Sequence, residues 1–256
     1  MIPAELEYVR PTTLDDALAA LAAEGAVPIA GGHSLVPMLK TRLARPSLVV
    51  DVRDVLPRGI SGDRSSVTIG AATTWRDLSA AREVPELVRE CASGIGDLQV
   101  RNHGTAAGSL AHADPASDFA AVALATDASL RLLSASGERV VAAADFFVGP
   151  FTTVLAQGEL IVEIVLPAEY AGSAYVAVED PASGYALAGA AVCVYGGGRS
   201  AIGLTGATAV PVRLDAVTSV DELDVLADAR TDAGYRRRLA AVVIERALAR
   251  ATERAA

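Results

Sequence analysis

The chain has 256 residues, 52% of them hydrophobic, so it is a globular protein long enough to bury a large core. Its net charge of −9 argues against nucleic acid and anionic membranes as partners, and its two distant cysteines, Cys91 and Cys193, argue against a disulfide framework or an iron–sulfur cluster. The sequence shows neither a signal peptide nor an apolar run long enough for a membrane span, so we expect a cytoplasmic protein.

The opening of the chain predicts a β-α-β-α-β unit. Thr13 and Asp16 form a capping-box pattern that begins the first helix, and Gly25 is placed to close it. The expected elements are a strand over 6–9, a helix ending at Ala23, a short strand before Gly31, a short helix ending near Leu43, and a strand over 48–52.

The turn inside this unit carries two adjacent glycines, Gly31 and Gly32. Such a pair lets the backbone adopt positive φ and approach a ligand closely. Ser34 is a favoured N-cap residue, and Pro37 is tolerated in the first helical turn. Because free N–H groups at a helix start attract anions, the turn predicts a phosphate or pyrophosphate cradle. The alternative is an ordinary glycine-rich turn between a strand and a helix.

Asp51 lies twenty residues after Gly31, where an acid could meet a ribose. The dinucleotide fingerprint G-x-G-x-x-G is missing around Gly31 and Gly32, which argues against a nicotinamide site. We therefore interpret Asp51 as a strand-end or turn residue.

Residues 57–64 are rich in Gly, Pro and Asp and predict a boundary between two parts of the chain. Residues 94–118 are rich in small residues, with little charge and no clear period, which suggests backbone packed against a ligand. Around this segment we expect a strand over 67–70, a helix capped by Thr74 and Asp77, a helix over 85–92, and a short apolar helix after residue 118.

The rest of the chain alternates strands with turns and ends in helices. We expect a hairpin from 129–133 and 139–142, strands over 159–166, 174–178, 190–195 and 200–205, and helices over 219–226 and 232–251. In the last helix, the apolar face is expected to carry Tyr235, Leu239, Val242 and Val243, with Arg236 to Arg238 in solvent.

Two segments together resemble a known family. The patterns A-G-G-H-S-L-V-P-M-L-K and R-N-H-G-T-A-A-G-S-L-A-H-A-D-P-A-S-D look like the FAD-binding medium subunit of molybdenum hydroxylases, the group of aerobic carbon monoxide dehydrogenase and of the xanthine dehydrogenase flavin domain. The resemblance extends to Gly184–Leu187 and to Tyr235–Leu239. It implies an α+β, para-cresol methylhydroxylase-type FAD-binding fold in three parts: an N-terminal α/β subdomain (1–56), a second α+β subdomain (57–167), and a C-terminal subdomain with an antiparallel sheet and helices (168–256).

The resemblance also implies the cofactor-binding residues. The first loop would wrap the FAD pyrophosphate with backbone N–H groups, and it comprises Ala30, Gly31, Gly32, His33 and Ser34, with Leu35 packed nearby. The second would contact phosphate and ribityl groups, and it comprises Thr105, Ala106, Ala107, Gly108 and Ser109.

Further roles follow from the same resemblance. Thr105 would donate its hydroxyl to the pyrophosphate, and Asp118 would accept a hydrogen bond from a ribose hydroxyl. Ile161 would pack near the adenine or the flavin, and Tyr185 would approach the isoalloxazine. Ala107 replaces the first glycine of the usual pair, and its methyl group requires a negative φ.

Each of these residues also has a purely structural interpretation. Asp118 could cap the helix that follows it, and Thr105 could form a local hydroxyl turn. His33 and His112 are interpreted as hydrogen-bonding residues, since the three histidines lack the spacing of a metal site.

The resemblance implies an oxidoreductase subunit whose chain has no catalytic residues and no metal of its own. A large partner subunit would carry molybdopterin, and a small partner would carry two [2Fe–2S] clusters, in a dimer of heterotrimers. FAD on this chain would pass their electrons to an external acceptor. The alternatives are a stand-alone FAD oxidoreductase and an assembly subunit that keeps the fold without FAD.

Overall fold

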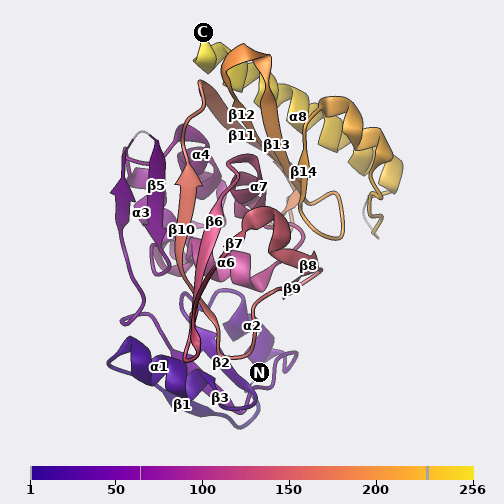
Figure 1. Ribbon diagram of the computed structural model, residues 1–256. Coiled ribbons are helices and arrows are strands. Elements are labelled where there is room, and N and C mark those ends of the chain that lie inside the picture. The colour runs from indigo at the N-terminus through magenta and orange to yellow at the C-terminus, as the bar shows by residue number, and fades with distance from the viewer. Residues whose placement is uncertain (1, 64, 229–230) are drawn as a thin grey trace.

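The computed structural model describes residues 2–63, 65–228 and 231–256, and it confirms the predicted α+β class. Three main sheets follow one another along the molecule, and the two termini lie toward opposite ends (Figure 1). Cys91 and Cys193 are both free and buried. Among the described helices, none combines the length and the apolar character needed to cross a bilayer.

The first sheet has three parallel strands in the order β1-β3-β2 and confirms the β-α-β-α-β unit. Thr13 caps the first helix: its Oγ1 accepts the Asp16 N–H at 3.1 Å and donates to the Asp16 carboxylate at 2.7 Å. The elements are β1 (Glu7–Val9), α1 (Leu14–Leu21), β2 (Ala26–Ile29), α2 (Leu35–Lys40) and β3 (Leu48–Asp51).

The middle sheet has five antiparallel strands in the order β4-β5-β10-β6-β7. Its strands are β4 (Ile60–Gly62), β5 (Ser66–Gly70), β6 (Ser129–Ser134), β7 (Gly137–Ala142) and β10 (Leu160–Pro167). A short insertion precedes β10 and contains η1 (Ala143–Asp145), β8 (Phe147–Gly149) and β9 (Thr152–Thr153).

Helices connect β5 to β6, and the first of them has the predicted capping box between Thr74 and Asp77. The helices are α3 (Trp75–Ala80), α4 (Glu86–Gly94), α5 (Leu98–His103), α6 (Ala106–His112) and α7 (Asp118–Ala125). The stretch 94–118 thus contains two short helices that its composition did not reveal. Because α5 buries no residue and α6 buries mostly alanine, neither produces a hydrophobic period.

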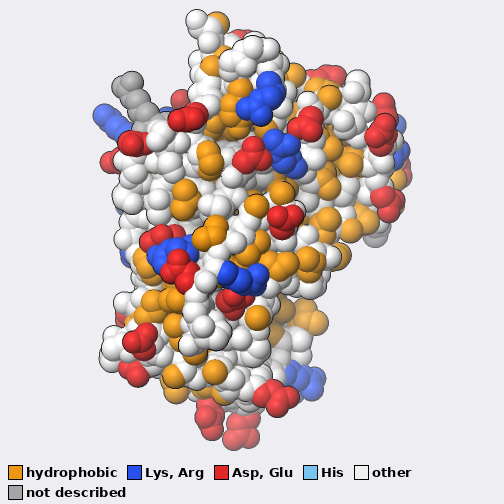
Figure 2. Space-filling view, viewed as in Figure 1, with side chains coloured by type: hydrophobic (Ala, Val, Ile, Leu, Met, Phe, Trp, Pro, Cys, Tyr) orange, Lys and Arg blue, Asp and Glu red, His pale blue; other side chains and the backbone are white. Residues whose placement is uncertain are grey.

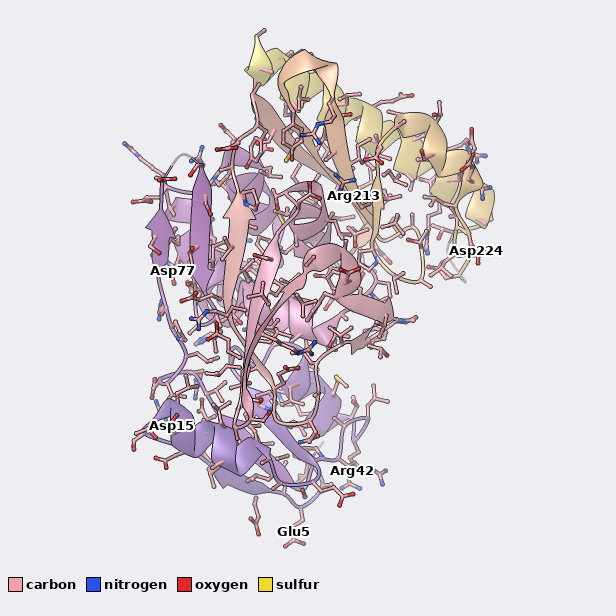
Figure 3. The ribbon with its side chains drawn as sticks, viewed as in Figure 1. Glu5, Asp15, Arg42, Asp77, Arg213 and Asp224 are labelled. Atoms are coloured by element: carbon pink, nitrogen blue, oxygen red, sulfur yellow. The ribbon has the colours of Figure 1, made fainter. Side chains whose placement is uncertain are left out.

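The third sheet is antiparallel, with α8 (Ala233–Ala255) packed on it, and α7 also contacts its strands (Figure 1). Small residues let α7 approach closely: a Cβ on Gly203 would lie 1.9 Å from the carbonyl oxygen of Ala121. Arg213, labelled in Figure 3, joins the sheet to Asp127 at 2.8 Å. The elements are β11 (Gly172–Glu179), β12 (Ala186–Val194), η2 (Gly196–Gly198), β13 (Ser200–Thr205), β14 (Val212–Leu214) and η3 (Val217–Glu222).

Two expectations for the C-terminal part were wrong. The helix expected over 219–226 is only the 3₁₀ segment η3, and β14 was not anticipated. The apolar face of α8 was only half right: Val243 is buried and Leu239 packs against the core, but Tyr235 is 42% exposed and Val242 36% exposed. Arg236, expected in solvent, is buried and bonded to Asp228. The buried face is formed by Ala240, Val243, Ile244, Ala247 and Ala251.

Side-chain size explains the error in α8. A Cβ on Gly172 would lie 2.1 Å from the carbonyl oxygen of Ala251, so helix and strand are too close for large side chains. Hydrophobicity alone selected Tyr235 and Val242 and missed the three alanines of the buried face.

Candidate functional site

The two glycine-containing turns line one cleft of about 520 Å³, within the usual size of ligand sites. The cleft also receives residues from the first and middle sheets and from the β11–β12 connection. Thirteen of the predicted residues line it: Ala30, Gly31, Gly32, His33, Ser34, Leu35, Thr105, Ala107, Gly108, Ser109, Asp118, Ile161 and Tyr185. Ala106 does not line it and is instead buried in the core.

The first turn is pressed against the segment that leads into the second. A Cβ on Gly31 would lie 2.2 Å from the His103 carbonyl oxygen and 2.8 Å from the Gly104 Cα, so no side chain fits there. Gly32 has a different reason to be glycine, since its φ is +74°. The rings of His33 and His103 lie 5.9 Å apart across this contact. The two loops therefore lie side by side, as the sequence predicts.

The N–H groups of the first turn are unusual because the fold does not use them. Those of Gly31, Gly32, His33 and Ser34 have no acceptor among the residues that the structure describes. Buried or partly buried backbone donors are nearly always paired, so four unpaired donors at a cleft wall indicate a place for an anion.

Ser34 does not act as the predicted side-chain cap. Its backbone is already helical, with φ −94° and ψ −50°, and its side chain makes no capping hydrogen bond to α2. An N-cap residue needs an extended backbone to reach back to the first turn, so that expectation was wrong.

Thr105 caps α6 and forms part of the second loop. Its Oγ1 accepts the Gly108 N–H at 3.1 Å, and a Cβ on Gly108 would lie only 2.8 Å from that oxygen. The local hydroxyl turn is thus confirmed, and the Thr105 hydroxyl proton is still free for a ligand. Ala107 lies within the helix and is not among the residues with positive φ, so its methyl group causes no strain.

Asp118 is the first residue of α7 and lines the cleft. Ser117 holds the N-cap position, so the capping interpretation of Asp118 is wrong. The Tyr175 hydroxyl donates to Asp118 Oδ1. Burial raises the pKa of Asp118 to about 6, the Tyr175 hydrogen bond lowers it, and the nearby Glu179 and Asp114 raise it further.

Apolar residues form much of the remaining wall. Ile161 on β10 is almost fully buried, and Trp75 at the start of α3 contributes the only tryptophan of the chain. Tyr185 is half exposed at the mouth of the cleft, and burial of its hydroxyl raises its pKa.

The charge of the lining is unusual for a site that attracts anions. Among the residues that the structure describes, no lysine or arginine lines the cleft, and the titratable lining residues are His33, His112, Asp114, Asp118 and Tyr185. Burial lowers the pKa of His112, whose ring packs 5.3 Å from the Phe151 ring. The face of the molecule in Figure 2 likewise mixes acidic and basic side chains instead of showing a basic patch.

Sequence reasoning missed Trp75 and Tyr175. The capping box predicted a helix start at Trp75 but not the direction of its side chain. Tyr175 lies in a β-strand with no motif around it, and its contact with Asp118 spans 57 residues of sequence. No local signal could have found that contact.

Comparison with known proteins gives a family match and close relatives. Residues 4–169 match the family described as "FAD binding domain in molybdopterin dehydrogenase". The carbon monoxide dehydrogenase medium chain of Afipia carboxidovorans is 36% identical over 100% of this chain and 99% of its own length. The glyceraldehyde dehydrogenase medium chain of Sulfolobus acidocaldarius is 40% identical over 76% of this chain and 71% of its own. The solved carbon monoxide dehydrogenase from Hydrogenophaga pseudoflava contains a chain that superposes with a TM-score of 0.93, covering 100% of both chains at 34% identity.

Proposed function

The chain belongs to the family of FAD-binding domains of molybdopterin dehydrogenases, and from this premise we propose that it passes electrons from the [2Fe–2S] clusters of a small partner subunit through FAD to an external acceptor. It is the FAD-binding medium subunit of an oxidoreductase of the molybdenum hydroxylase type. Substrate oxidation would take place at molybdopterin on a large partner subunit. The three-part division at residues 56 and 167 agrees with the three main sheets and is retained as part of the proposal.

The unpaired N–H groups of Gly31 to Ser34 carry the proposal. A pyrophosphate needs several hydrogen-bond donors, and backbone N–H groups supply them without a cationic side chain. The cleft offers such donors beside the capped second loop, and its described lining contains no lysine or arginine. The residues present therefore fit a flavin dinucleotide.

Each part of the cleft suits a different part of FAD. Gly31 to Ser34 and the Thr105 hydroxyl would donate to the pyrophosphate, and Asp118 would accept from a sugar hydroxyl. Ile161 would pack against a ring, and Tyr185 would lie near the isoalloxazine at the mouth of the cleft. Bound FAD supplies the redox chemistry, while the chain orients it and excludes water.

The alternative of an assembly subunit without FAD rested on Ala107. Because Ala107 lies in α6 and is not among the residues with positive φ, that objection to FAD binding is removed. We further propose that the chain works in the cytoplasm within a dimer of heterotrimers formed with the large and small subunits. A stand-alone oxidoreductase would purify without them.

The test is to purify the full chain with its genomic neighbours and measure flavin, iron and molybdenum. We expect one FAD per chain, with iron and molybdenum only when the partners are present. Gly31→Ala should abolish FAD retention because its Cβ collides with His103, whereas Gly196→Ala, with no atom within 4 Å of the added Cβ, should retain it. A colourless wild-type complex that ignores added FAD would overturn the proposal.

A further inference from the structure

The C-terminal sheet reaches the cleft through one buried hydroxyl. Tyr175 lies on β11, is almost fully buried, and donates its hydroxyl to Asp118 at the start of α7. Among the described residues, no other side chain makes a hydrogen bond to the Asp118 carboxylate. The orientation of the acid that faces the cleft therefore depends on a residue from a different sheet.

Gly189 on the neighbouring strand makes this contact sterically feasible. A Cβ on Gly189 would lie 2.4 Å from the Tyr175 hydroxyl oxygen and would displace it. Gly189 is not among the glycines with positive φ, so its backbone does not require glycine. Space for the Tyr175 hydroxyl is the reason for glycine at this position.

The backbone of Tyr175 is held as firmly as its side chain. Glu90 on α4 accepts the Tyr175 N–H at 2.9 Å with Oε2. The other oxygen of Glu90 accepts from Arg254 at 2.7 Å and from Arg250 at 3.3 Å, both on α8. Strand, helix α4 and helix α8 thus fix the position from which Tyr175 reaches Asp118.

We propose that Tyr175 is a positioning residue of the flavin site, which holds Oδ1 of Asp118 so that Oδ2 accepts a hydrogen bond from a sugar hydroxyl of FAD. This inference rests on the proposed function. It assigns the C-terminal sheet a part in nucleotide binding through Asp118, although that sheet contributes no residue to either phosphate loop. A single tyrosine hydroxyl thereby links α8, through Glu90 and β11, to the cofactor.

The titratable groups near Asp118 are acidic or neutral, so the effect of Tyr175 on the protonation of Asp118 can be measured. Glu179, Asp114, the Cys91 thiol and the Tyr185 hydroxyl are the other titratable groups near it, and none of them carries positive charge. The Tyr175 hydroxyl therefore stabilises the charged form of Asp118 without help from a cation. Its removal should favour the protonated acid, which cannot accept as well from a sugar hydroxyl.

The test compares Tyr175→Phe with Tyr170→Phe, which removes a buried hydroxyl lining a separate groove. FAD binding to the full chain, within its complex where partners are needed, is followed by quenching of Trp75 fluorescence from pH 5 to pH 8. We expect Tyr175→Phe to weaken FAD binding about tenfold near neutral pH. The midpoint of its pH–Kd curve should move to higher pH, a change that loosened packing would not produce. Tyr170→Phe should leave both the FAD affinity and the midpoint of the pH–Kd curve unchanged.

A second measurement does not depend on FAD. Carbon-13 NMR of the Asp118 carboxyl in the flavin-free chain should show a higher titration midpoint in Tyr175→Phe than in wild type, and Gly189→Ala should reproduce the shift. If wild type binds FAD and Tyr175→Phe leaves both the Kd profile and the carboxyl titration unchanged, the positioning role is overturned and the proposed function stands. If wild type binds no FAD, the proposed function falls.

Discussion

Two regions of the molecule each contain a tyrosine that donates its hydroxyl to an aspartate, but the two aspartates differ in their other partners. At the end of β3, Asp51 accepts the Tyr8 hydroxyl at 2.6 Å; at the start of α7, Asp118 accepts the Tyr175 hydroxyl. Asp51 also binds Arg53 at 2.6 and 3.0 Å, and these bonds hold its pKa down at about 2. Asp118 has no cationic partner in the described part of the chain, and burial raises its pKa to about 6.

The difference shows how a structural acid and a binding acid can be told apart. Asp51 is fully satisfied within the fold and has nothing left to offer a ligand. Asp118 is held by one neutral donor in a cleft, so its charge is incompletely compensated until something else donates to it. The sequence placed both acids within reach of a sugar, and only their partners separate them.

The largest expected effect is on cofactor affinity. Asp118→Asn should weaken FAD binding by roughly 10- to 100-fold, because a charged acceptor of a sugar hydroxyl is lost. Asp51→Asn should leave the FAD dissociation constant unchanged. Fluorescence titration of both variants with FAD checks this contrast. Equal losses of FAD affinity in the two variants would show that Asp118 is no more a binding acid than Asp51.

The sequence was sufficient to predict the local structure on which the site is built. The β-α-β-α-β unit, the capping boxes at Thr13 and Thr74 and the two loops at the cleft follow from local patterns and were predicted correctly. Local patterns work there because caps and turns depend on neighbouring residues.

What failed depends on tertiary packing. On α8, Val243 and Leu239 were placed correctly, but the buried alanines were missed because close approach to β11 favours small side chains there. Arg236 was placed in solvent although it is buried. The contact of Tyr175 with Asp118 joins a strand to a helix far away in sequence. No period or motif records which distant side chain will meet an acid.

The next effect is on stability. Asp51→Ala should lower the free energy of unfolding by roughly 2–3 kcal/mol, because a buried carboxylate with a tyrosine and an arginine partner is removed. Asp54→Ala removes an exposed partner of Arg10 and should cost much less than Asp51→Ala, because solvent screens this pair. Urea denaturation of both variants gives the comparison, and similar costs would show that Asp51 is no more structural than a surface acid.

The two acids should also give opposite pH dependences. Asp51 has a folded pKa below its ordinary value of 3.8, so its stabilisation is present above that pH and is lost as the pH falls toward about 2. Asp118 has a folded pKa above 3.8, so its protonated form stabilises the fold at low pH, and that contribution is lost as the pH rises through about 6.

Unfolding free energies measured between pH 3 and pH 8 separate these contributions. Without FAD, Asp118→Asn should remove a decline on the order of 1–2 kcal/mol between about pH 4 and pH 6, and the variant should be at least as stable as wild type at neutral pH. If the unfolding free energy of Asp118→Asn changes with pH as steeply as that of wild type across this interval, the pH dependence comes from other groups. Asp118 would then not be an uncompensated acid.

The smallest effect tests whether Arg53 alone makes Asp51 different from Asp118. Arg53→Gln should raise the pKa of Asp51 toward its ordinary value, because the side-chain hydrogen bonds from Arg53, the largest cause of the lowered pKa, are removed. The Arg53 side chain is 49% exposed, so solvent screens the pair and the stability loss should stay below about 1 kcal/mol. Carboxyl NMR titration measures the pKa of Asp51 directly, with Arg58→Gln, whose partner is Asp77, as a control at an exposed arginine. A pKa still near 2 in Arg53→Gln would mean that the Tyr8 hydroxyl and the backbone N–H of residue 53 suffice to hold the charge, and the Arg53 side chain would then not be what distinguishes Asp51 from Asp118.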